Sequence, residues 1–132
     1  KSEVSIRGLH ILLAEDNELN MEIAEFMLQN EGADVTKAWN GREAVEIFRK
    51  SEPDEFDVIL MDIMMPVMNG YEATKMIRSL EREDAKTIPI IAMTANAFTE
   101  DRLKAKEAGM DEHIAKPVDP ELLVKVIYES VD

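Results

Sequence analysis

Two short segments of the sequence, residues 58–61 and 90–93, are apolar at every position. A strand that is buried on both faces has this pattern, and such strands occur in parallel sheets with helices on both sides. Between the short apolar runs lie stretches in which apolar residues recur every three or four positions. This alternation predicts five consecutive β-strand and α-helix units. The expected strands are residues 9–14, 34–38, 58–61, 90–93 and 112–115.

The five expected helices differ in how much apolar surface they offer. The first begins near Asn20 and carries Ile23, Phe26 and Met27 on its apolar face. The fourth, at about residues 100–108, has the fewest inward candidates, so we expect it to be held by less apolar contact than its neighbours and to shift at lower cost. Those candidates are Leu103, Ala105 and Ala108.

Parallel strands joined by helices require right-handed crossovers, which place helices on both faces of the sheet. The fold class is therefore α/β, a doubly wound five-stranded parallel sheet with five helices. A chain of 132 residues without repeats or linkers fits one domain, with its core at about residues 9–131. Sheets of this kind bind ligands at the carboxyl ends of their strands, where the strand order reverses.

Composition narrows the range of partners. The chain has 15 basic and 28 acidic residues and a net charge of −13, which disfavours direct binding to nucleic acid or to anionic membranes. It has no cysteine, which excludes disulfides and thiolate chemistry. No apolar run approaches the roughly 20 residues that cross a bilayer, and we expect a cytoplasmic protein. Because the first residue is Lys1 rather than Met, we expect a segment of a longer protein.

Chemically active side chains follow four of the expected strands. Glu15 and Asp16 follow the first, Asp62 the third, Thr94 the fourth and Lys116 the fifth. The carboxyl ends of parallel strands share one edge of the sheet, so these groups should lie near one another. If the first and third strands are neighbours, as in the flavodoxin-like order, three carboxylates crowd into one crevice.

This group of side chains suits phosphoryl transfer. Crowded carboxylates raise one another's pKa or require a cation, and an oxygen site with room for water suits Mg²⁺. Lys116 adds a positive charge and Thr94 a hydroxyl, the groups that hold the oxygens of a phosphoryl group during its transfer. Asp62 is then the predicted nucleophile, since carboxylates form acyl-phosphate intermediates.

The arrangement resembles the response-regulator receiver domain, the phosphoacceptor module of two-component signalling, over residues 9–131. The similarity implies the strand order 2-1-3-4-5 and a cis peptide bond before a proline. The family's acidic pair, phosphoacceptor, switch hydroxyl and lysine–proline step correspond to Glu15 with Asp16, Asp62, Thr94, and Lys116 with Pro117.

The resemblance also implies a metal site, partners and a reaction. Mg²⁺ would bind Asp16, Asp62 and the backbone carbonyl of Met64, with Glu15 acting through water. Asp62 would accept a phosphoryl group from the phosphohistidine of a histidine kinase or a histidine-phosphotransfer domain. The domain would then change conformation and signal to a downstream output domain. It would promote its own phosphorylation and dephosphorylation without turning over a free substrate.

Finer features point to a subgroup. Residues 15–17 with Asn20, residues 61–66 with Asn69-Gly70, and residues 93–97 are most similar to the receivers of hybrid sensor histidine kinases. That similarity favours a receiver excised from a longer kinase over a stand-alone one. It would place the receiver in the cytoplasmic part of a membrane-bound sensor.

One position departs from the family pattern. Three residues before Lys116 the family carries Tyr or Phe as part of its switch, and this chain carries His113. Imidazole titrates near physiological pH. We therefore expect that the conformational response depends on pH.

Three other functions fit parts of the sequence. A phosphohydrolase of the haloacid-dehalogenase type also uses an aspartate and Mg²⁺, but it needs a second Asp where this chain has Met64. A flavin or nucleotide carrier needs a Gly- or Ser/Thr-rich phosphate loop, where Glu15 and Asp16 would instead repel phosphate. A receiver-like scaffold that binds partners without phosphorylation stays open as an alternative.

Overall fold

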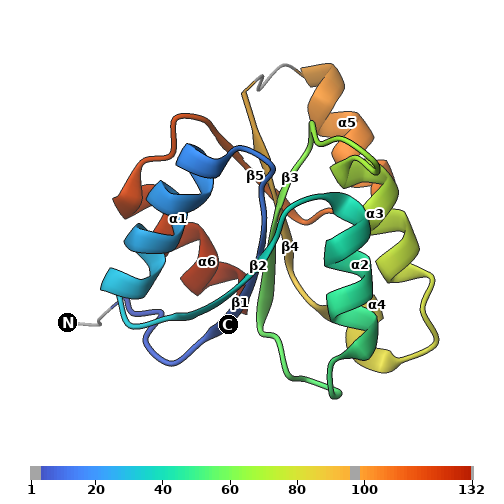
Figure 1. Cartoon of the computed structure of the whole chain (residues 1–132), viewed down its shortest axis with the longest axis horizontal. Coiled ribbons are helices and arrows are strands. Elements are labelled where there is room, and N and C mark those ends of the chain that lie inside the picture. The colour runs from blue at the N-terminus through green and yellow to red at the C-terminus, as the bar shows by residue number, and fades with distance from the viewer. Residues whose placement is uncertain (1–3, 96–98, 132) are drawn as a thin grey trace.

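The computed structural model describes residues 4–95 and 99–131. They form a five-stranded parallel sheet in the order β2-β1-β3-β4-β5 (Figure 1), which confirms the predicted fold class and strand order. Both strands that are apolar throughout, β3 and β4, are buried at every position. The strands are β1 (His10–Ala14), β2 (Asp34–Ala38), β3 (Val58–Asp62), β4 (Ile90–Thr94) and β5 (Glu112–Ala115).

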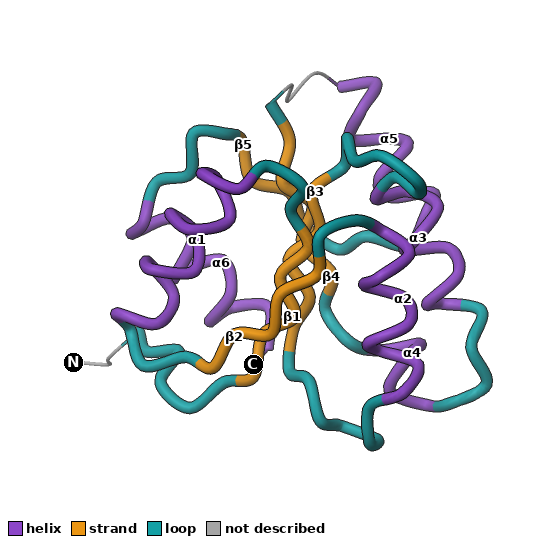
Figure 2. Tube along the Cα trace, in the orientation of Figure 1, coloured by secondary structure: helices purple, strands orange, loops and turns teal. Residues whose placement is uncertain are grey.

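Helices cover both faces of the sheet. In Figures 1 and 2, α1 and α6 lie on one side of the strands and α2, α3 and α5 lie on the other. Each side has its own cluster of buried apolar residues. The helices are α1 (Glu18–Asn30), α2 (Gly41–Lys50), α3 (Gly70–Arg78), α4 (Glu83–Thr87), α5 (Thr99–Ala108) and α6 (Pro120–Val131).

The described residues contain six helices, where the sequence predicted five. The additional helix is α4, a five-residue element between α3 and β4. Its one buried apolar side chain is Ala85, so it has no apolar periodicity for sequence analysis to detect. Long-range hydrogen bonds of the preceding Arg82 fasten it to the rest of the fold instead.

Of the three residues predicted for the apolar face of α1, Met27 packs against a buried cluster, but the other two do not. Ile23 and Phe26 are 45% and 70% exposed. The buried residues of α1 are Met21, Ala24 and Leu28. Because α1 has apolar residues on two faces and both satisfy helical spacing, the sequence pattern could not select the core face.

The surface of α5 is less apolar on its inner side than predicted. Ala105 and Ala108 are buried as expected, but Leu103 is 59% exposed. Among the described side chains of α5, these two alanines are the buried apolar ones. Across the described ranges, no helix is long and apolar enough to cross a membrane.

Candidate functional site

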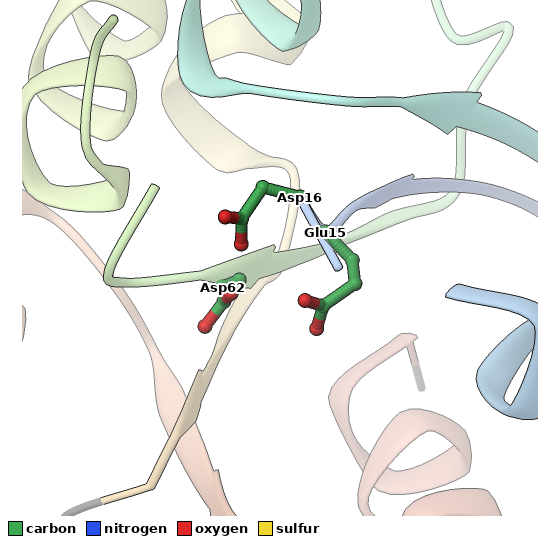
Figure 3. A group of neighbouring side chains, drawn as sticks. All are labelled: Glu15, Asp16 and Asp62. Atoms are coloured by element: carbon green, nitrogen blue, oxygen red, sulfur yellow. The ribbon is translucent and has the colours of Figure 1, made fainter. Parts of the chain in front are cut away.

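Three carboxylates converge at the carboxyl ends of β1 and β3. These strands are neighbours, with Ala14 paired to Met61, so the residues that follow them meet at one edge. Ligand oxygens of Glu15, Asp16 and Asp62 all lie within 4.8 Å of one another. Figure 3 shows the three side chains together beyond the strand ends. The predicted convergence of acidic groups is therefore present.

Lys116 lies inside this carboxylate cluster. It follows β5, and its ammonium Nζ donates to Glu15 Oε1 at 2.9 Å and lies 3.1 Å from Asp62 Oδ1. The peptide bond between Lys116 and Pro117 is cis. The lysine thus bridges two of the three acidic side chains, one of them 101 residues away in the sequence.

Glu15 is more constrained than the other two acids. Its Oε1 accepts from Lys116 and its Oε2 accepts from the backbone N–H of Asn17 at 3.0 Å. Its side chain is buried, whereas Asp16 is exposed. Asp16 therefore offers the most available oxygens of the three acids, and Glu15 contributes its charge.

The cluster is short of positive charge. Burial, followed by the negative charge of Glu15, raises the pKa of Asp62 to about 7, although Lys116 opposes the shift. Burial alone would lower the pKa of Lys116, but its hydrogen bond to Glu15 and the charges of Asp62 and Glu15 raise it instead. Three carboxylates and one ammonium leave two formal negative charges, which one divalent cation would neutralise.

The donor set suits Mg²⁺. Carboxylate oxygens are hard ligands, and the exposure of Asp16 leaves room for the waters that Mg²⁺ retains. The side chain of Met64 is 77% exposed, and a thioether is a soft ligand that Mg²⁺ does not favour, so only the backbone carbonyl of Met64 would suit this metal. The acidic cluster can accordingly hold a divalent metal ion.

Gly70 fixes the loop that follows Asp62, a role that sequence analysis did not assign. A Cβ at Gly70 would lie 2.3 Å from the carbonyl oxygen of Asp62, and the Gly70 N–H donates to Ile63 O at 2.8 Å. Asn69 and Glu72 form a reciprocal cap at the start of α3. The Asn69-Gly70 pair was the available signal, because only glycine lets α3 begin this close to the β3 backbone.

Thr94 and His113 lie on adjacent strands at different distances from the cluster. Thr94 is buried at the end of β4, and its carbonyl accepts from the Lys116 N–H at 2.8 Å. His113 is half-buried within β5 and lines a groove beside α5, outside the carboxylate cluster. Asn96 and Ala97, part of the hybrid-kinase-like stretch, lie outside the described residues.

A pocket of about 230 Å³ borders the cluster on the side of α1. Glu15 and Lys116 contribute its charged lining, and Ile23, Pro117 and Val118 are among its apolar residues. Sequence analysis missed this pocket because it assigned Ile23 to the apolar face of α1. The exposed face of that helix instead forms part of the surroundings of the site.

The sequence model described as Response regulator receiver domain matches residues 11–128. The chain is 41% identical over 123 residues to Hybrid signal transduction histidine kinase I of Dictyostelium discoideum, covering 92% of this chain and 7% of that protein. It is 37% identical to Histidine kinase 1 of Arabidopsis thaliana, covering 96% and 13%, respectively. The chain thus spans less than a sixth of the length of these relatives.

Solved structures agree with the sequence matches. The receiver domain of sensor histidine kinase PA1611 from Pseudomonas aeruginosa PAO1, with a magnesium ion in its active-site cleft, superposes with a TM-score of 0.85 at 39% identity, covering 94% of this chain and 98% of that one. The receiver domain of Ssk1 from Saccharomyces cerevisiae, crystallised with the histidine phosphotransfer protein Ypd1, gives 0.84 at 32% identity, covering 93% and 88%.

Proposed function

The chain belongs to the response-regulator receiver family, a module of two-component phosphorelays, and on that premise we propose that Asp62 is its phosphoacceptor. One observation carries the proposal. Asp62 is a buried member of a three-carboxylate cluster that has one bridging lysine and is two positive charges short of neutrality, and its neighbour Glu15 already has both oxygens in hydrogen bonds. Residues 9–131 then form a single receiver domain.

The reaction is transfer of a phosphoryl group from a phosphohistidine. A carboxylate oxygen of Asp62 forms a bond to phosphorus while the bond between phosphorus and the imidazole nitrogen breaks. Only the ionised carboxylate can do this, and the raised pKa of Asp62 means that the cation-free site holds it partly protonated near neutral pH. Positive charge at the site therefore favours both the reactive form of Asp62 and the incoming phosphoryl oxygens.

Mg²⁺ supplies that charge when bound, as a Lewis acid on the phosphoryl oxygens. Asp16, Asp62 and the backbone carbonyl of Met64 would hold it. Glu15, whose two oxygens already accept hydrogen bonds, would act on it only through water. Glu15 also keeps Lys116 pointed at Asp62, where the ammonium can bind a phosphoryl oxygen.

Thr94 and His113 are the residues that would communicate the phosphorylated state. The Thr94 hydroxyl would bind a phosphoryl oxygen, and the backbone bond from Lys116 to Thr94 couples β5 to that movement. His113 occupies the groove beside α5, where an aromatic ring is usual in the family. The spectral change on phosphorylation should then vary more with pH between 5.5 and 8 in the wild type than in His113→Tyr, in which only the Asp62 titration remains.

The phosphodonor would dock over α1 and the loop after β5. Leu19, Ile23 and Phe26 recur at helical spacing on the exposed side of α1 and continue into the pocket beside Lys116. Apolar patches next to a charged site are typical of protein interfaces. The Ssk1 receiver was crystallised with a histidine phosphotransfer protein, and a histidine-phosphotransfer domain or a histidine kinase is the partner proposed here.

The wider context is also a proposal. Similarity to long histidine kinases supports an origin in the cytoplasmic part of a hybrid sensor kinase, with an output domain downstream. The acidic surface supports a partner that is neither nucleic acid nor a membrane.

Intact mass spectrometry after incubation with a small phosphodonor and Mg²⁺ tests the phosphoacceptor. The wild type should gain one acid-labile phosphoryl group, and chelation of Mg²⁺ should abolish the gain. Asp62→Asn should gain none, whereas Asp34→Asn, a control on an exposed strand position, should behave as the wild type. No gain in the wild type would favour the phosphorylation-independent scaffold.

A further inference from the structure

One arginine side chain fastens the carboxyl end of α5 to three neighbouring elements. At the carboxyl end of the helix, the Arg78 guanidinium donates through Nε and Nη2 to Gly109 O at 3.0 and 2.8 Å. The same side chain donates to Ala85 O in α4 and to the Asp111 carboxylate just before β5. One arginine from α3 therefore ties together α4, the carboxyl end of α5 and the start of β5.

Local structure reinforces this attachment. Gly109 has a φ of +109°, and its N–H and that of Met110 donate back to Lys106 O and Ala105 O, which closes α5 with a glycine cap. A Cβ at Gly109 would lie 2.9 Å from Arg78 Cγ. The Asp111 oxygen that binds Arg78 also accepts from the Ile90 N–H at 2.9 Å, which links the cap to the start of β4.

Toward the amino end of α5, the side chains that the structure describes are more exposed. Arg102, Leu103 and Lys104 are exposed, and Ala105 is the first buried side chain among the described residues of α5. A groove of about 310 Å³ lies beside the helix and is lined by Arg102, Lys106, Met110 and His113, among others. The groove gives α5 open space on the side of β5.

We propose that Arg78 is a pivot for α5: it holds the carboxyl end of the helix fixed while the amino-terminal part swings over the groove lined by His113. The inference rests on the proposed function, because phosphorylation of Asp62 is what would drive the swing. Arg78 acts as a positioning residue, since it touches neither the carboxylate cluster nor the phosphoryl group.

A pivot makes a geometric prediction that differs from a sliding helix. At 1.5 Å per residue, Leu103 lies about 9 Å along the axis from Gly109 and Glu107 lies about 3 Å from it. The two residues are four positions apart and share one face of α5. A rigid swing about Gly109 should displace them in a ratio of about three to one, whereas a sliding helix displaces them equally.

Spin-label distances can measure this ratio. The chain has no cysteine, so labels attach only at introduced positions. The reference is Glu22→Cys, an exposed position on α1 across the sheet, paired in turn with Leu103→Cys and Glu107→Cys. Beryllofluoride with Mg²⁺, a stable mimic of an aspartyl phosphate, should change the first distance about three times as much as the second.

Arg78→Lys tests the residue, and Arg82→Lys is the matched control. Arg82 also links elements at the same edge of the sheet through backbone carbonyls, but its bonds go to α2 and α4 rather than α5. In Arg78→Lys the two displacements should become similar, and in Arg82→Lys the ratio should stay near that of the wild type. Equal displacements in the wild type, or none at either position, would overturn the pivot.

Hydrogen exchange tests the attachment without phosphorylation. The Gly109 and Met110 amides should exchange about tenfold faster in Arg78→Lys, beyond any change in global stability, and should not do so in Arg82→Lys. Unchanged exchange in Arg78→Lys would also overturn the proposal. Failure of Asp62 phosphorylation is read separately by intact mass, so the two hypotheses fail in different experiments.

Discussion

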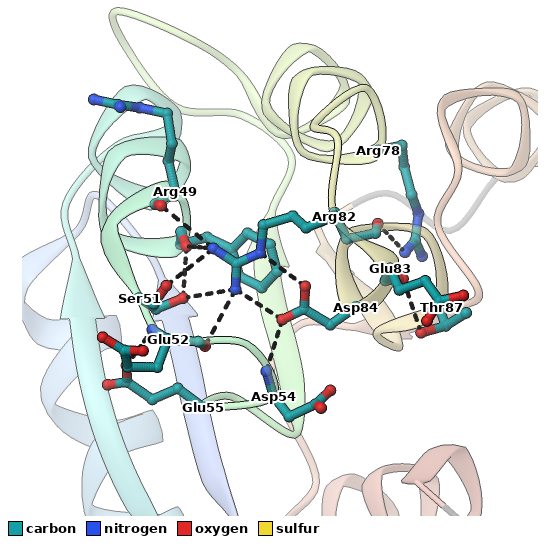
Figure 4. A network of polar contacts seen from close by, with 12 residues as sticks. Arg49, Ser51, Glu52, Asp54, Glu55, Arg78, Arg82, Glu83, Asp84 and Thr87 are labelled. Carbon is teal, nitrogen blue, oxygen red and sulfur yellow. Dashed lines mark hydrogen bonds and ion pairs between the residues drawn. The ribbon is translucent and has the colours of Figure 1, made fainter.

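The two edges of the sheet each hold a partly buried cationic side chain, but its charge is balanced at one edge and not at the other. At the amino-terminal edge, Arg82 donates to both oxygens of Asp84 at 2.8 Å and to backbone carbonyls of Phe48 and Ser51 at 3.0 Å (Figure 4). Its guanidinium also lies 4.5 Å from the centre of the Phe48 ring. At the carboxyl edge, Lys116 is shared among acids that outnumber it.

The pKa values of the two acids record this difference. The hydrogen bond from Arg82 lowers the pKa of Asp84 to about 2. Burial raises the pKa of Asp62 to about 7. A balanced ion pair with every donor used stabilises the fold, whereas an unbalanced one lowers stability and creates affinity for a cation. The amino-terminal edge thus has its charges paired, and the carboxyl edge is short of positive charge.

Removing the balanced cation should have the largest effect. Arg82→Ala removes the guanidinium from the partly buried Asp84 carboxylate, which keeps only the Asp54 N–H, and from the Ser51 carbonyl, at a cost of about 3 kcal/mol in the free energy of unfolding. Urea denaturation with an unchanged m-value measures it. Arg49→Ala, whose ion pair with Glu46 is exposed, should leave the free energy of unfolding nearly unchanged. Similar losses in both variants would contradict the role given to the Arg82 network.

Removing the charge of Asp62 should change the free energy of unfolding in the opposite direction. Asp62→Asn eliminates a buried charge that the metal-free protein accommodates poorly, and at pH 8 it should raise the free energy of unfolding by about 2 kcal/mol. Asp34→Asn, at an exposed position, should change it by less than about 0.5 kcal/mol. If Asp62→Asn lowered the free energy of unfolding without metal, the inference that this edge is short of positive charge would be wrong.

Sequence analysis succeeded where local pattern and topology agree. Apolar runs defined β3 and β4, and the rule that ligands bind at the carboxyl ends of strands brought Asp16, Asp62 and Lys116 to one edge. These predictions required no side-chain geometry. Each depended on where a strand stops and which residue follows it.

The hydrogen bonds of Arg82 and Arg78 could not be predicted from the sequence pattern. Arg82 bonds to residues about 30 positions away, and Arg78 reaches Gly109 and Asp111. In sequence each is an arginine near the end of a helix, where basic residues are common on the surface. Likewise, the spacing of α1 could not tell its core face from the face beside the pocket, because both are apolar.

Mg²⁺ should partly remove the difference between the edges. A cation that binds only the folded state stabilises it by RT ln(1 + [Mg²⁺]/Kd), which is about 1.4 kcal/mol at ten times Kd. Thermal unfolding of the wild type should therefore shift upward with Mg²⁺, while Asp16→Asn should shift much less at the same concentration. An equal shift in both would mean that the ion binds elsewhere.

The last prediction concerns how the free energy of unfolding depends on pH, because Asp62 and Asp84 should affect it in opposite directions. The raised pKa of Asp62 means that the folded metal-free protein binds more protons than the unfolded chain between about pH 4 and 7, so this group adds stability as the pH falls through that window. The lowered pKa of Asp84 works in reverse: its stabilisation, about 1 kcal/mol for a pair near the surface, is complete above pH 4 and disappears toward pH 2. The free energy of unfolding can be measured against pH for the wild type and both variants. The difference between the wild type and Asp84→Asn should change with pH only between about pH 2 and 4, and the difference between the wild type and Asp62→Asn only between about pH 4 and 7. If both differences changed with pH in the same direction, the two edges would not differ in charge balance.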